Sequence, residues 1–173
     1  MKKMLRFVLP FLVMLVSIIL VSLINLNRGI VIVRDNHGLK PIEITANRYQ
    51  DAHCGMSLPS ADFAGQVISP DGKTWFFHDP GGIPLWLKAK TKSFKDQATI
   101  WFFTMDTKRW LTADKTWFSV ITSTPMGYGF AAHEHKGDGF IQYREMAIRM
   151  ERGEHMLNPR VRTSLLRRNH ANR

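Results

Sequence analysis

The longest apolar stretch of the chain lies near its beginning, and shorter apolar runs separated by turn residues fill the remainder. Residues 7–26 carry no charged side chain, and about 20 apolar residues are enough to cross a bilayer as a helix. Lys2, Lys3 and Arg6 precede this run, and basic residues favour the cytoplasmic side of a membrane segment. We therefore expect an uncleaved single-pass anchor in the inner (cell) membrane, in contact with the bilayer through residues 7–26, with the body facing the periplasm.

The first part of the body has the pattern of a β-hairpin followed by a helix and another strand. Residues 63–69 and 73–78 are predicted strands, and the Pro70-Asp71-Gly72 segment between them is typical of a hairpin turn. Asp79 is placed to cap a short helix that continues to about residue 88. The apolar run at residues 98–105 predicts a further strand.

The second part repeats this pattern less clearly. Strands are predicted at residues 115–122, 130–135 and 140–143, with a Gly-rich loop after the first and a Lys-Gly-Asp-Gly turn after the second. Residues 144–154 place apolar side chains among charged ones at spacings that indicate a helix. The two parts therefore resemble an internal repeat, although coincidence among short, common turns is an alternative explanation.

These elements together predict an α+β fold, in which an N-terminal transmembrane helix is followed by two tandem small ββαβ-type repeats. The first repeat contains a Cys-Gly-Met motif and the second a Pro-Met-Gly motif. The expected divisions are a membrane anchor at 1–28, a connector at 29–49, a first repeat at 50–108, a second repeat at 109–157 and a basic tail at 158–173.

The net charge of +10 raises the question of nucleic-acid binding, since basic surfaces attract phosphate. The basic residues gather before the apolar run and in the C-terminal tail, and no recognition helix, RNA-binding aromatic motif or zinc-finger spacing lies between them. We expect solvated charge and attraction to anionic lipid headgroups, with no nucleic-acid partner.

Sulfur chemistry is the most informative feature of the body. Cys54 is the only cysteine of the chain, and Met56 follows it two residues later. A thiolate and a thioether this close form a soft pair that favours Cu(I). Cys54 lies in a turn region and not in an apolar run, which argues against a purely structural, buried role. Met126, in the Gly-rich loop of the second repeat, is the candidate for a further thioether ligand.

A histidine could complete such a site, and the sequence leaves four candidates open. His53 is adjacent to Cys54, His78 follows the predicted hairpin, and His133 and His135 share one face of a predicted strand. The identity of the remaining copper ligands among these four therefore stays open.

Other kinds of chemistry fit the residues less well. A structural zinc site needs repeated Cys/His pairs, which one cysteine cannot supply. A membrane-anchored thiol enzyme that uses Cys54 would need a histidine base, and no signature places one against the thiol. A structural subunit of a membrane complex, without a metal, is the third alternative.

Several short motifs are similar to those of the NosL family, the accessory proteins of nitrous-oxide reductase maturation. The similarity covers roughly residues 46–151 and is carried by these segments: Cys54-Gly55-Met56, Phe63-Ala64-Gly65-Gln66, Asp71-Gly72-Lys73, Phe77-His78-Asp79-Pro80-Gly81 and Pro125-Met126-Gly127.

This resemblance implies a copper chaperone and not an enzyme: a protein facing the periplasm that binds one Cu(I) and supplies it for assembly of the reductase. It also implies a tandem-repeat α+β fold, distantly like that of organomercurial lyase, and a metal-binding role for Cys54 and Met56. Two features depart from the family. Many members have a second cysteine where Asp51 stands here, and members are commonly lipoproteins.

Overall fold

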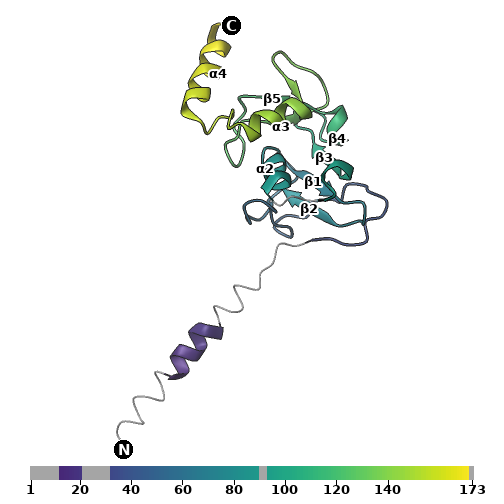
Figure 1. Ribbon diagram of the computed structural model, residues 1–173, viewed down its shortest axis with the longest axis vertical. Helices are drawn as coiled ribbons and strands as arrows, with labels where there is room; N and C mark the ends of the chain where they lie inside the picture. The colour runs from purple at the N-terminus through teal and green to yellow at the C-terminus, as the bar shows by residue number, and fades with distance from the viewer. Residues whose placement is uncertain (1–11, 21–31, 90–92, 172–173) are drawn as a thin grey trace, which may run out of the picture. The chain divides into compact units, whose positions relative to one another are not determined.

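The computed structural model describes residues 12–20, 32–89 and 93–171. The chain separates into two compact units, Met1–Ile30 and Val31–Arg173. All of the sheets and the candidate chemistry belong to the second unit (Figure 1).

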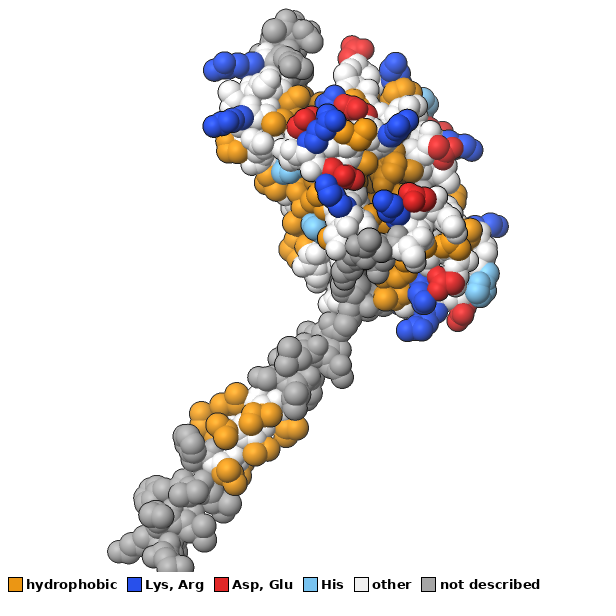
Figure 2. Space-filling model, in the orientation of Figure 1, with side chains coloured by type: hydrophobic (Ala, Val, Ile, Leu, Met, Phe, Trp, Pro, Cys, Tyr) orange, Lys and Arg blue, Asp and Glu red, His pale blue; other side chains and the backbone are white. Residues whose placement is uncertain are grey.

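The prediction of an N-terminal transmembrane helix is wrong for the described residues. Residues 12–20 form a helix whose apolar side chains are exposed (Figure 2), whereas 7–11 and 21–26 lie outside the described residues. In the parts of the chain that the structure describes, no helix has both the length and the apolar character needed to cross a membrane.

The first sheet has four antiparallel strands in the order β2-β1-β3-β4. They are β1 (Gly65–Ile68), β2 (Thr74–Phe77), β3 (Thr99–Phe103) and β4 (Trp110–Thr112). The predicted hairpin joins β1 to β2, and its turn places Gly72 at a φ of 80°, which a glycine adopts at little cost. β4 lies beyond residue 108, so the first sheet extends into the segment that the sequence pattern assigned to the second repeat.

Helix α2 (Gly82–Ala89) covers one face of this sheet (Figure 1). A Cβ atom on Gly65 would lie 2.6 Å from Cδ1 of Ile83, so the helix packs directly on the backbone of β1. The ring of Trp86 contacts Trp75 and Phe77, which are two residues apart on β2 and therefore face the same side.

The predicted connector covers the opposite face. Tyr49 stacks on Phe76 with ring centroids 4.0 Å apart. The backbone of Ile42 exchanges two hydrogen bonds with the buried side chain of Gln66, and Val33 pairs with Thr74. Residues 32–49 are thus a packed layer of the fold, which brings residue 51 against the end of β2.

The second sheet has three antiparallel strands in the order β6-β5-β7. They are β5 (Trp117–Ser119), β6 (Ala131–His133) and β7 (Ile141–Gln142), followed directly by α3 (Tyr143–Glu151). Around the first sheet the order along the chain is strand, strand, helix, strand, as expected. Around the second sheet all three strands come before α3, which differs from the predicted ββαβ order. The first strand of each sheet, β1 or β5, lies between two neighbours.

Packing between the two sheets joins the halves into one body. Phe102 of β3 meets Phe118 of β5 edge to face, with centroids 4.9 Å apart, and α2 packs against α3. The connecting 3₁₀ turns are η1 (Lys95–Gln97) and η2 (Ala113–Lys115), and the expected basic tail contains helix α4 (Pro159–Ala171).

Candidate metal centre

The Cys-Gly-Met motif forms the tip of a tight turn against the end of β2. Within the turn, the Asp51 N–H donates to the carbonyl of Met56 at 2.7 Å, and the Gly55 N–H donates to the carbonyl of Asp51 at 2.8 Å. Gly55 has a φ of 79°, a conformation that glycine favours. The N–H of Ala52 binds the Phe76 carbonyl at 2.8 Å. This contact places the turn beside His78, which directly follows the strand.

The carboxylate of Asp51 organises this turn from inside the protein. Its Oδ1 accepts the backbone N–H groups of His53 at 2.7 Å and Cys54 at 3.1 Å. Its Oδ2 accepts the backbone N–H of His78 at 2.8 Å and faces the Nδ1 atom of the same residue at 2.6 Å. Burial acts to raise the pKa of Asp51, but the hydrogen bonds, led by that of the His78 side chain, outweigh it and lower the pKa.

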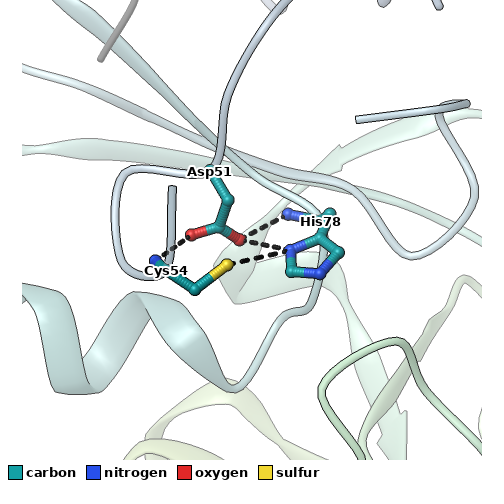
Figure 3. A group of neighbouring side chains, drawn as sticks. All are labelled: Asp51, Cys54 and His78. Atoms are coloured by element: carbon teal, nitrogen blue, oxygen red, sulfur yellow. Dashed lines mark hydrogen bonds and ion pairs between the residues drawn. The ribbon is translucent and has the colours of Figure 1, made fainter. Parts of the chain in front are cut away.

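The Cys54 thiol lies on the same side of the imidazole. Its Sγ atom is 3.8 Å from Nδ1 of His78, and the donor atoms of Asp51, Cys54 and His78 all lie within 4.8 Å of one another (Figure 3). In the described part of the chain, this is the one group of three such donors close enough to hold a metal ion. Burial, with a smaller contribution from Asp51, raises the pKa of the Cys54 thiol.

The distances distinguish two ligands from one supporting group. A thiolate and an imidazole on one metal ion lie roughly 3.5 to 4.3 Å apart, given bonds of about 2.3 and 2.0 Å. The observed 3.8 Å between Cys54 and His78 fits this range. Two ligands at about 2.0 Å from one ion lie at least about 2.8 Å apart, so the 2.6 Å contact of Asp51 with Nδ1 of His78 is a hydrogen bond. An ion bound at Nδ1 therefore replaces the proton that this nitrogen shares with Asp51.

The same geometry disfavours a thiol nucleophile with a histidine base. In such a relay one ring nitrogen faces the nucleophile and the other donates to the carboxylate. Here Nδ1 of His78 faces both Cys54 and Asp51, while its Nε2 is buried without a hydrogen-bond partner. A raised pKa of the Cys54 thiol also runs against activation.

The loop that carries Met126 is held against this turn. The Met126 N–H donates to Oδ2 of Asp79 at 2.9 Å, and Asp79 directly follows His78. The hydroxyl of Tyr128 lies 3.3 Å from Nε2 of His53. Met126 is half-buried, whereas Met56 is 48% exposed. The structure therefore brings the second candidate loop to the Cys54 turn.

The four candidate histidines have different neighbours in the structure. His78 approaches Cys54, and His53 pairs with Tyr128. His133 packs against the ring of Phe140 with centroids 4.7 Å apart, and His135 pairs with an aspartate on another loop. His78 is thus the histidine that the fold places in the candidate site.

Asp51 is the site residue that sequence reasoning missed. The motif resemblance distinguishes this position only as one where many NosL members have a cysteine. The available signal was its spacing, because an aspartate three residues before Cys54 can accept the N–H groups of a following turn. Its contact with His78 depends on the parallel bridge between Asp51 and Phe76, which is not local in sequence.

No protein-family model matches the chain, and no curated protein matches its sequence. The resemblance to the NosL family therefore stays a prediction that rests on the motifs.

Proposed function

We propose that this protein binds one Cu(I) ion through Cys54 and His78 and delivers it to a copper enzyme. The observation that carries the proposal is the 3.8 Å separation of a thiol and an imidazole nitrogen at a turn that also carries Met56. The ion is cargo, and the protein is a binding and transfer protein without a catalytic step of its own.

The choice of Cu(I) follows from the donor set. The Asp51 carboxylate accepts three backbone N–H groups, from His53, Cys54 and His78, so it is better suited to hold the turn and His78 in place than to bind an ion. The donors that remain are a thiolate, an imidazole and thioethers, which suit a soft monovalent ion better than a hard one. The proposed ligands are Cys54, His78, Met56 and Met126.

Exposure of the turn supports transfer in addition to binding. Cys54 is half-buried and Met56 is 48% exposed, so an incoming ligand from a partner can reach the site and replace the ligands one at a time. From the motif resemblance we propose that the recipient is nitrous-oxide reductase or its assembly machinery, in the periplasm.

Competition titration of the full chain with a chromophoric Cu(I) chelator tests the proposal. We expect one tight site per chain that is lost in Cys54→Ser and retained in His135→Asn, a matched change in a histidine outside the site. Unchanged copper affinity in Cys54→Ser would refute the proposal and favour a structural role.

A further inference from the structure

Asp79 is a buried carboxylate that joins two loops far apart in the sequence. Its side chain is fully enclosed. Oδ1 accepts the Gly81 N–H at 3.0 Å, Oδ2 accepts the Met126 N–H at 2.9 Å, and the Thr124 hydroxyl is a further donor. One oxygen therefore shapes the turn before α2, and the other holds the loop that carries Met126.

The burial of this carboxylate is unfavourable for folding. The carboxylate is removed from water, and the hydrogen bonds from Thr124, Gly81 and Met126 offset part of that cost. These three donors are neutral groups, so they compensate less than a buried cation would. A buried charged group that lowers stability is a feature of functional sites more often than of ordinary cores.

Tyr128 holds the same loop through contacts with Gly81 and with His53, the residue before Cys54. The ring of Tyr128 packs so closely on Gly81 that a Cβ atom there would lie 2.8 Å from it, and the Tyr128 hydroxyl reaches His53. The loop is thus attached to residues before and after the thiol. Among these contacts, only the Asp79 hydrogen bond acts on the backbone of Met126 itself.

We propose that Asp79 is a positioning residue that holds Met126 so that its thioether completes the copper site of Cys54 and His78. The inference rests on the proposed function and names the residue through which the second half of the protein joins the site. Loss of the carboxylate releases the loop, and the Met126 sulfur leaves the ion while Cys54 stays bound.

A double-mutant cycle in the full chain tests this role, with Asp79→Asn, Met126→Leu and the pair. The asparagine amide cannot accept both backbone N–H groups. We expect each single change to remove one sulfur from the copper shell in X-ray absorption and to weaken Cu(I) binding by about 10- to 100-fold. The double variant should be no weaker than the single ones, because both changes remove the same contact.

Independent, additive losses, or an unchanged sulfur count in Asp79→Asn, would overturn the positioning role. Cys54→Ser separates this failure from that of the proposed function, because it abolishes binding only if the copper site itself exists. If Asp79→Asn does not fold, Thr124→Val removes the hydroxyl donor beside the same loop. Thr124→Val should also reduce the sulfur count, and combining it with Met126→Leu should weaken Cu(I) binding no further than Met126→Leu alone. Additive losses in this pair would also overturn the proposal.

Discussion

Two aspartate–histidine pairs in this protein share one hydrogen-bond pattern and differ in their surroundings. In each pair, one carboxylate oxygen accepts the backbone N–H of the histidine and faces its Nδ1 atom. The ring contacts are 2.6 Å for Asp51 with His78 and 3.1 Å for Asp106 with His135. Asp106 also accepts the Glu134 N–H at 3.0 Å, much as Asp51 accepts those of its own turn.

The two pairs differ in how deeply they are buried and in whether a thiol lies beside them. The side chains of Asp51 and His78 are 1% and 6% exposed, against 26% for Asp106 and 76% for His135. Within the described residues, only the first pair has a thiol beside it. In both pairs the aspartate binds a loop to the residues that follow a strand. Only the Asp51–His78 pair is buried and lies beside a thiol, Cys54, and these two features make it the candidate metal centre.

The largest expected effect is on copper binding after loss of the thiol. Cys54→Ser should weaken Cu(I) binding by more than about 100-fold, the upper end of what loss of an outer-shell partner costs. His135→Asn in the exposed pair should leave it unchanged. Chelator competition measures both variants, and equal effects would contradict the distinction between the two pairs.

Removal of each carboxylate should lower the free energy of unfolding more at the buried pair than at the exposed pair. Asp51→Asn disrupts a buried network of hydrogen bonds to a charged group and should lower the free energy of unfolding by about 3 kcal/mol. Asp106→Asn acts at a partly exposed pair and should lower it by about 1 kcal/mol or less. Urea unfolding of the two variants gives the comparison, and a larger loss at Asp106 would reverse it.

Loss of the imidazoles should change copper affinity at one pair only. His78→Asn removes a proposed ligand but leaves Cys54, so we expect binding to weaken by roughly 10- to 100-fold. The same change at His135 is the matched control, since its ring is distant from the candidate centre. Retained affinity in His78→Asn would exclude His78 as a ligand.

The smallest expected effect is the acid dependence of stability. Hydrogen bonds lower the pKa of both Asp51 and Asp106 below 3.8. A depressed pKa in the folded state adds stability above the unfolded value, and this stability is lost as the pH falls below about 3.8 through the folded value. Asp106→Asn should therefore lose less stability between pH 4 and pH 2 than the parent chain, measured by urea unfolding. An unchanged dependence would show that Asp106 does not contribute.

Local sequence signals predicted the elements whose determinants are close in the chain. The Asp71-Gly72 turn predicted the β1–β2 hairpin, the apolar run before Met105 predicted β3, and the residues around Cys54 predicted a turn. Each was predicted from a short run of neighbouring residues, where turn chemistry and the pattern of apolar side chains are informative.

The remaining features depend on distant contacts or on length. Asp51 reaches His78 only because the segment before it packs across the first sheet, as the stacking of Tyr49 on Phe76 shows. The polar composition of that segment suggested a connector instead. The apolar run near the beginning suggested a spanning helix, whereas no helix in the described ranges is long and apolar enough to cross a membrane.

X-ray absorption at the copper edge of the Cu(I)-loaded full chain tests the central claim most directly. We predict a mixed first shell that contains a thiolate sulfur and at least one imidazole nitrogen, with the sulfur reduced in Cys54→Ser and the nitrogen lost in His78→Asn. A shell that keeps the same sulfur and nitrogen neighbours in both variants would contradict copper binding by Cys54 and His78.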